Sequence, residues 1–218
     1  MLVKKMENID ISRYLIKRYG KICTSADLKE KFGNKYMHYI AKLTNTWWIR
    51  PLPIFRGVYY ILDPEEKQMR LFRQTKFQIH INVLNKVMKS NWYFSRSTAL
   101  HLLGAINQPV SKYYIANSKI SKRVRSKFFG ELIFVKTRGK IGTKYGVISK
   151  KYKDSTYTVG TVERIIADYL YIYVHGHITK KVLLNQRNSL KYDETELKRI
   201  VAESYPRLSS IKMLSLIR

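Results

Sequence analysis

The sequence is poor in cysteine, in acidic residues and in long apolar runs. Its 218 residues include a single cysteine, Cys23, which excludes an intramolecular disulfide and a metal site built from several cysteines. No apolar run approaches the ~18 residues that a membrane-spanning helix requires. The first ten residues, MLVKKMENID, soon become charged and lack the apolar core of a signal peptide. We therefore expect a soluble, cytoplasmic protein without a membrane partner.

Sequence patterns typical of enzymes are also missing. The chain has no phosphate-binding loop, no GxSxG nucleophile and no Cys/His dyad at a family spacing. His175 and His177 lack a third ligand nearby, so a metal site is not expected. Glu163 and Asp168 diverge by about 500° around a helix, whereas Arg164 and Asp168 have the i, i+4 spacing of an ion pair. We predict no enzyme activity, no catalytic residue, no metal and no cofactor.

Positive charge is what the chain has in excess. It contains 42 Lys and Arg against 15 Asp and Glu, which gives a formal net charge of +27. Residues 1–75 carry 15 of these basic and 7 of these acidic residues, and residues 76–218 carry the other 27 and 8. Nucleic acid is the commonest partner of such a chain, and a solvated basic surface is the alternative. The apolar fraction of 45% is high enough for a folded core.

The first 62 residues predict three helices followed by a β-hairpin. Residues 8–20 have an amphipathic period, and a second helix should begin after Thr24, with Asp27 completing its cap, and end at Gly33. Residues 46–62, TWWIRPLPIFRGVYYIL, contain two apolar runs around a proline-containing turn, which predicts the hairpin. This order favours a winged helix-turn-helix over a helical hairpin that only buries a core.

The third helix is the expected recognition helix. Asn34 should cap it, and we expect Met37, Ile40, Ala41 and Leu43 to face inward. In a helix-turn-helix the second helix of the motif enters the major groove and contacts base edges. The predicted DNA-contacting residues of this helix are Lys35, Tyr36, His38, Tyr39 and Lys42. Packing of the two tyrosines in the core is an open alternative.

Further DNA contacts are predicted on either side of this helix. A phosphate is expected near Thr24 and Ser25, because the start of a helix carries partial positive charge. Arg50 and Arg56 flank the hairpin turn, where arginines suit minor-groove insertion or contact with phosphate. The hairpin would then act as the wing of the DNA-binding domain.

The rest of the chain predicts a second, mixed domain. Residues 63–76 lose the apolar period and gain charge, which indicates a linker, so we expect a DNA-binding domain at 1–72 and a basic domain at 73–218. The expected strands are 92–95, 112–117, 131–137, 145–149 and 155–160, and the expected helices are 77–89, 97–104, 161–174 and segments near 177–187, 193–203 and 206–217. The predicted fold class is α+β, with a small β-sheet and a helical C-terminal part at about 161–218.

The densest basic run is SKISKRVRSKFFG, residues 118–130. Its cationic side chains are Lys119, Lys122, Arg123, Arg125 and Lys127. Lysines and arginines that track phosphates supply affinity without reading sequence. We predict a second phosphate-contacting set here, with a solvated loop as the alternative.

Four short motifs together resemble a known family. They are RGVYYI (56–61), NWYFSRSTALHLLGAI (91–106), SKRVRSKFFGELIFVKT (121–137) and TVERIIADYL (161–170). In their order and spacing they resemble AbiEi-type antitoxins of type IV toxin–antitoxin systems, over roughly residues 10–172. The resemblance implies a transcriptional repressor that binds double-stranded DNA in its own promoter. It also implies a nucleotidyltransferase-like toxin as partner and a structural role for Glu163, Arg164 and Asp168.

The leading expectation is therefore a DNA-binding transcriptional repressor that autoregulates its operon and acts as an antitoxin. One alternative is a basic DNA- or RNA-binding regulator without a toxin partner, which the high charge favours. Another is a protein that mainly sequesters the toxin. A nuclease is the least favoured, because the sequence has no convergent acidic cluster.

Overall fold

The computed structural model describes residues 7–107 and 110–217 and has an α+β fold. The chain divides into two compact units, Met1–Val87 and Met88–Arg218, which we call the N-terminal and C-terminal units. The division falls later than residue 72 because α5 (Lys76–Met88) contacts the N-terminal helices. Lys86 of α5 lies 3.0 Å from the Asp27 carboxylate and 5.1 Å from the centre of the Tyr19 ring.

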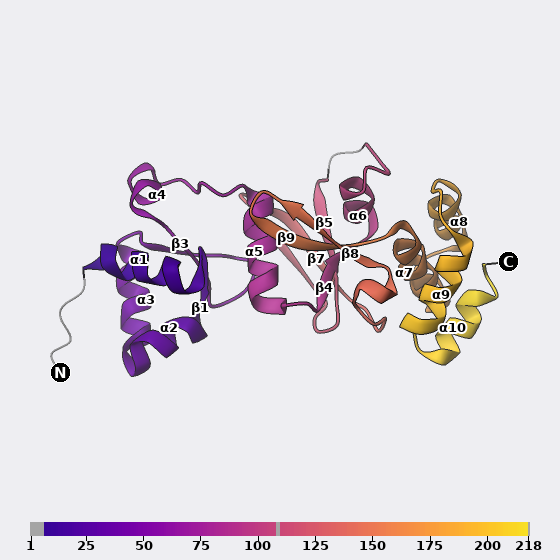
Figure 1. Ribbon diagram of the computed structural model, residues 1–218, viewed down its shortest axis with the longest axis horizontal. Coiled ribbons are helices and arrows are strands. Elements are labelled where there is room, and N and C mark those ends of the chain that lie inside the picture. The colour runs from indigo at the N-terminus through magenta and orange to yellow at the C-terminus, as the bar shows by residue number, and fades with distance from the viewer. Residues whose placement is uncertain (1–6, 108–109, 218) are drawn as a thin grey trace. The chain divides into compact units, whose positions relative to one another are not determined.

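Three helices dominate the start of the N-terminal unit (Figure 1). They are α1 (Asn8–Tyr19), α2 (Ser25–Phe32) and α3 (Tyr36–Asn45). Ile11 and Leu15 form the buried face of α1, as their i, i+4 spacing predicts. Thr24 and Asp27 form the predicted capping box of α2, each side chain accepting a hydrogen bond from the other residue's backbone N–H. Gly33, with φ of 56°, ends that helix.

The predicted β-hairpin is confirmed as part of a small sheet. The strands are β1 (Ile22–Thr24), β2 (Ile49–Pro51) and β3 (Val58–Ile61). Their order is β1-β3-β2, and both pairings are antiparallel. The apolar core between this sheet and the helices includes Leu15, Leu28, Leu43 and Ile49.

The segment that charge and lost periodicity predicted as a linker contains a short helix, α4 (Pro64–Met69). Asp63 and Glu66 form a capping box at its start. The buried Glu66 carboxylate also accepts hydrogen bonds from the Tyr60 hydroxyl at 2.6 Å and the Lys21 ammonium at 2.5 Å. The prediction of a linker was wrong because the charged Glu66 side chain is bound to Lys21 and Tyr60 and holds the segment against the sheet.

The C-terminal unit contains a six-stranded sheet. Its strands are β4 (Trp92–Phe94), β5 (Lys112–Asn117), β6 (Lys122–Ser126), β7 (Gly130–Lys136), β8 (Val147–Tyr152) and β9 (Ser155–Gly160). The order is β6-β7-β5-β4-β9-β8. Antiparallel hairpins β6–β7 and β8–β9 form the two edges, whereas β5–β7 and β4–β9 are parallel. The expected strands are present, and β6 is an addition within the basic run.

The predicted helices of this unit are also present. They are α6 (Arg96–Leu102), α7 (Val162–Val174), α8 (Lys180–Asn188), α9 (Glu194–Ser204) and α10 (Arg207–Leu214). Helix α7 contacts each of α8, α9 and α10, and Figure 1 shows the four gathered at the C-terminal end of the chain. Their shared core includes Ile166, Leu170, Leu197 and Ile200.

Among the helices in the described part of the chain, none has the length and apolar character needed to cross a membrane.

Candidate nucleic-acid interface

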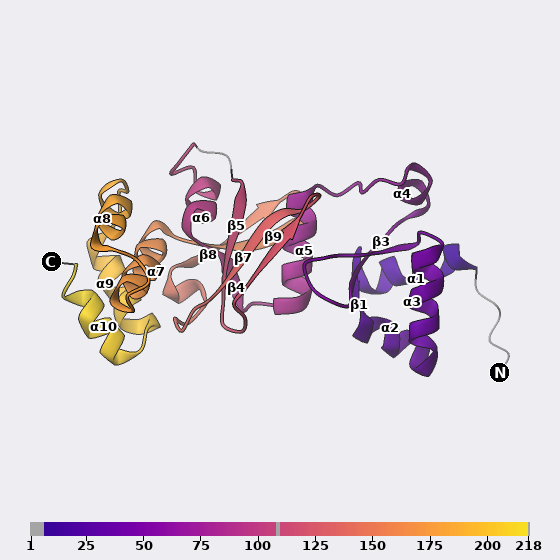
Figure 2. The same cartoon turned by 180° about the vertical axis from the view of Figure 1, so that it is seen from behind.

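Helices α2 and α3 are held together at the turn between them (Figure 2). The rings of Phe32 and Tyr39 stack with their centroids 4.0 Å apart and their planes 15° apart. A short 3₁₀ turn, Gly33–Lys35, joins the helices. Asn34 lies within this turn and does not cap α3, which begins without a side-chain cap. The helix-to-helix geometry therefore depends on the glycine and the ring stack.

Helix α3 presents a different outer face from the predicted one. Leu43 is fully buried and Ile40 packs against the core, as expected. Met37, by contrast, is 60% exposed, and Ala41 is exposed as well, so their prediction as inward residues is wrong. Tyr39 occupies the inward space instead, because its ring extends sideways to Phe32.

The outer face of α3 nevertheless brings together three of the predicted DNA-contacting residues. Lys35, which ends the 3₁₀ turn before α3, and His38 are exposed, and Lys42, one turn beyond His38, is partly exposed. Tyr36 is also partly exposed, whereas Tyr39 is engaged with Phe32. The face is thus a basic stripe to which exposed Met37 adds an apolar contact that the sequence prediction missed.

The predicted phosphate position at the start of α2 is already occupied by protein groups. The Ser25 backbone N–H donates to the Gly57 carbonyl at 2.8 Å. The Asp27 carboxylate accepts hydrogen bonds from both the N–H and the hydroxyl of Thr24, and Lys86 neutralises it. Thr24 and Ser25 therefore have structural partners within the N-terminal unit, and their contact with a phosphate stays a prediction.

The two hairpin arginines have different environments. Arg56 is exposed in the connection between β2 and β3. Arg50 lies on β2 with its guanidinium carbon 3.7 Å from the centre of the Trp47 ring, and the guanidinium of Arg70 lies 5.2 Å from the same ring. Stacking on an aromatic ring fixes the direction of an arginine and leaves its N–H groups available.

The second basic run forms an edge strand and not a solvated loop. On β6 the side chains alternate, so Arg123, Arg125 and the following Lys127 are exposed while Lys122 is partly buried. Burial lowers the pKa of Lys122, whose ammonium lies 5.2 Å from the Phe134 ring centre. Glu131 on β7 pairs with both Arg123 and Arg125. The exposed cations of this run therefore share one face of the hairpin, and Lys119 is exposed just before it.

The motif around Arg164 and Asp168 forms a buried polar cluster. The two side chains form the predicted i, i+4 ion pair, at 3.4 Å. Asp168 accepts hydrogen bonds from Tyr93 at 2.7 Å, Ser95 at 2.9 Å and Tyr205 at 2.6 Å. The sequence predicts the pair but not its three hydroxyl partners, which come from distant segments.

The environment of this cluster keeps its tyrosines neutral. Burial raises the pKa of Tyr93 well above its usual value, and the negative charge of Asp168 raises it further. Burial also raises the pKa of Tyr205, and the nearby Arg164 only partly offsets the effect. The hydroxyls therefore remain hydrogen-bond donors at neutral pH, as a structural cluster requires.

Within the described residues, no group of three or more His, Cys, Asp or Glu side chains is arranged to hold a metal ion. His175 and His177 follow α7, and His175 Nε2 lies 3.3 Å from the Ser209 hydroxyl.

The fold thus defines an α+β protein whose helical N-terminal unit carries a basic helix face. It is similar to the crystal structure of the Rv2827c protein from Mycobacterium tuberculosis, with a TM-score of 0.55 and 12% sequence identity. The match covers 95% of this chain and 74% of that one. At this identity the likeness concerns the fold alone. No protein-family model and no curated protein sequence matches the chain.

Proposed function

We propose that this protein is a sequence-specific, double-stranded-DNA-binding repressor whose N-terminal unit is a winged helix-turn-helix. The observation that carries the proposal is the outer face of α3, where Lys35, His38 and Lys42 lie beside exposed Met37. Lysine and histidine donate to base or phosphate acceptors, and an apolar side chain suits the thymine methyl group. The opposite face of α3 is buried, so these side chains are free to enter a groove.

The hairpin β2–β3 would serve as the wing. Its exposed Arg56 and its ring-stacked Arg50 suit the narrow, electronegative minor groove or the flanking phosphates. The exposed cations of β6 add a second phosphate-contacting surface in the C-terminal unit. Together with the net charge of +27, these features support strongly salt-dependent binding.

The resemblance to AbiEi-type antitoxins supports a more specific role. In that role the protein represses its own operon and counteracts a nucleotidyltransferase-like toxin encoded beside it. A basic regulator without a toxin partner would share the DNA-binding surface and lack the second activity.

The test is a binding titration of a fluorescent duplex from the region upstream of the protein's own gene, against a scrambled duplex of equal length. We expect a preference of about a thousandfold at physiological salt. His38→Ala and Lys42→Ala should each reduce that preference about tenfold, because base-edge contacts discriminate by about 1–3 kcal/mol.

Lys17→Ala is the matched control, since Lys17 is an exposed lysine on α1. It should leave the preference unchanged. If His38→Ala and Lys42→Ala weaken both duplexes equally, α3 does not read bases. If wild-type protein binds both duplexes equally, the repressor proposal itself fails.

A second function, binding a partner protein, is favoured by two exposed apolar residues on α10. Leu208 is 80% exposed and Ile211 is 58% exposed, three residues apart on the same helix. Adjacent exposed apolar side chains commonly mark an interaction site. Leu208→Asp with Ile211→Asp should abolish co-purification with the product of the adjacent gene, whereas Ile148→Asp on β8 should not.

A further inference from the structure

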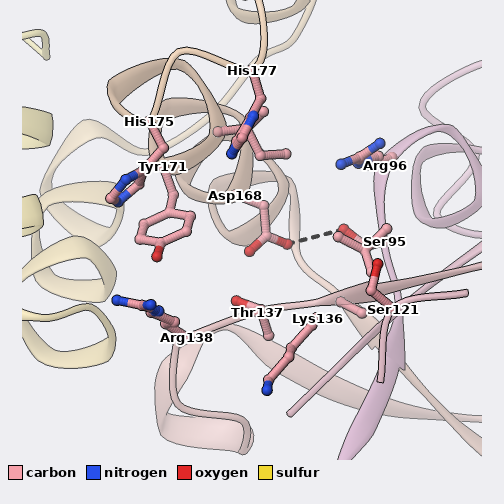
Figure 3. Close-up of a pocket in the computed structure, with 13 residues that line it drawn as sticks. Ser95, Arg96, Ser121, Lys136, Thr137, Arg138, Asp168, Tyr171, His175 and His177 are labelled. Atoms are coloured by element: carbon pink, nitrogen blue, oxygen red, sulfur yellow. Dashed lines mark hydrogen bonds between the residues drawn. The ribbon is translucent and has the colours of Figure 1, made fainter. Parts of the chain in front are cut away.

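A cavity of about 520 Å³ lies in the C-terminal unit, bordered by the sheet and α7 (Figure 3). Its lining comes from separate segments, including the start of α6, strand β5, the end of β7 and the C-terminal half of α7. The volume is within the range of about 300–1,000 Å³ that is typical of small-molecule sites. It suits a compact ligand and not a DNA duplex.

Three cationic side chains line this cavity. Arg96 begins α6, Lys136 ends β7 and Arg138 follows it. Figure 3 shows Arg96 and Arg138 on opposite sides of Asp168 and His177 above it. Within the described part of the chain, none of the three cations forms an ion pair with a carboxylate.

The cavity has one acidic lining residue, and its oxygens are already committed. Asp168 accepts from Tyr93, Ser95 and Tyr205 and faces the buried Arg164. Its charge is therefore balanced from within the protein. The positive charge of the lining is left available for an anionic ligand.

The backbone at Arg96 supports a ligand-binding role. Its φ of 51° lies in the left-handed region, which side chains other than glycine rarely adopt. The other described non-glycine residues with positive φ are Trp47, Arg70, Lys89 and Lys153. They follow helices or lie in a hairpin turn, where this conformation is usual. Arg96 instead starts a helix, and strained backbone of this kind concentrates at ligand sites.

The remaining lining provides an apolar wall and hydroxyl groups. Ala116, Val135 and Ile172 supply apolar contact, and Ser121 and Thr137 supply hydroxyl donors. An apolar wall in a cavity lined by cations on opposite sides matches a ligand with a flat apolar part and phosphate groups. Arginine binds phosphate through paired N–H groups, and lysine adds a point charge.

We propose that this cavity binds a phosphorylated small molecule of nucleotide size, which spans the cavity between Arg96 and Arg138 and pairs its phosphate groups with the cationic lining. This site is separate from the α3 face and does not depend on the DNA-binding proposal. The bound molecule as a whole would connect the start of α6 with the segment that follows β7.

The test is isothermal titration calorimetry of the full chain with ADP, GDP, CDP and UDP at physiological salt. We expect saturable one-to-one binding of at least one diphosphate, and at least tenfold weaker binding of its nucleoside. Arg96→Ala and Arg138→Ala should each weaken binding at least tenfold. Arg125→Ala, an exposed arginine on β6 outside the cavity, should leave it unchanged.

Arg96→Gly separates binding from folding. Glycine accepts the left-handed backbone, so this variant should melt no lower than Arg96→Ala while still failing to bind. Absence of binding for all four diphosphates would overturn the proposal. If Arg125→Ala weakened diphosphate binding as much as Arg96→Ala and Arg138→Ala do, the proposal would also be overturned, because binding would then reflect general charge attraction. Displacement of the diphosphate by duplex DNA, dependent on Arg96, would assign the site to nucleic-acid phosphate and also overturn it.

Discussion

At the scale of single residues, a charged pair persists inside the C-terminal unit with little access to water. Arg164 is fully buried and Asp168 is 7% exposed. Burying a charge is costly unless it is paired and hydrogen-bonded. Arg164 donates to the carbonyls of Lys140 and Tyr145, and Asp168 receives hydroxyl donors, so both charges have hydrogen-bond partners. Among the described residues, only the buried Arg164 Nη2 of this pair lacks one. The cluster thereby ties α7 to the loop after β7.

Asp168→Asn should strongly destabilise the C-terminal unit. The amide keeps the shape but removes the charge that compensates buried Arg164, and breaking a buried pair costs about 3–5 kcal/mol. Urea unfolding followed by far-ultraviolet circular dichroism measures the loss. Asp154→Asn, at an exposed carboxylate, is the control and should change stability by less than about 0.5 kcal/mol. Equal stability of the Asp168 variant and wild type would contradict the structural role.

At the scale of elements, the start of α2 and the β2–β3 connection depend on one glycine. Gly57 has φ of 72°, and its carbonyl accepts the Ser25 N–H. A Cβ added at Gly57 would lie 2.7 Å from the Ser25 Oγ. A larger residue would therefore displace the Ser25 hydroxyl and place a side chain on a left-handed backbone. The hairpin therefore packs directly against the start of α2, and this contact holds the proposed wing beside the proposed recognition motif.

Gly57→Ala should destabilise the N-terminal unit by about 1–3 kcal/mol, through left-handed backbone strain and the contact with Ser25. Gly20→Ala is the matched control, because Gly20 has φ of 74° but nothing within 4 Å of an added Cβ. Urea unfolding should show a larger loss for Gly57→Ala than for Gly20→Ala. Equal losses of unfolding free energy in the two variants would mean that the Ser25 side chain moves away without destabilising the protein.

At the scale of the whole molecule, the carboxylates are few and several are used internally. Glu66 anchors α4, Glu131 pairs with β6 arginines and Asp168 compensates Arg164. With 42 basic against 15 acidic side chains, the chain has too few carboxylates to pair with most of its cations. Buried tyrosines accompany these carboxylates in both units, and their hydroxyls must stay protonated to donate. Burial raises the pKa of Tyr60, and its contact with Glu66 raises it further.

Stability should therefore fall as pH rises above about 10, the usual tyrosine pKa. The unfolded chain releases these protons near that pH while the folded chain retains them, so alkali favours unfolding by about 1.4 kcal/mol per pH unit for each retained proton. Below about pH 10 the contribution of these tyrosines is fully present. Urea unfolding between pH 9 and about 11.5 measures the slope.

Tyr205→Phe should reduce that slope by about one proton, because lysine titration is common to both proteins. An unchanged slope would mean that the Tyr205 hydroxyl titrates normally in the folded state.

Local patterns identified most of the elements and failed where side-chain direction was decisive. The capping box at Thr24 and the hairpin turn depend on residues close in sequence, so they were predictable. Met37 was misassigned because hydrophobicity alone marked it as buried, and Tyr39 filled the space through its stack on Phe32. The strand β6 was missed because its charges concealed the alternation of a sheet edge.

By itself the sequence determined the charge, the amphipathic helices, the hairpin and the Arg164–Asp168 spacing. These depend on composition and on contacts within a few residues. Only the tertiary structure decided that Tyr93 and Tyr205 meet Asp168 across 75 and 37 residues. It also brought Arg96, Lys136 and Arg138 to one cavity. Such contacts join residues far apart in the sequence, and they form only once the strands are ordered and the helices are packed. The local hydrophobic period of a segment carries no information about these distant partners.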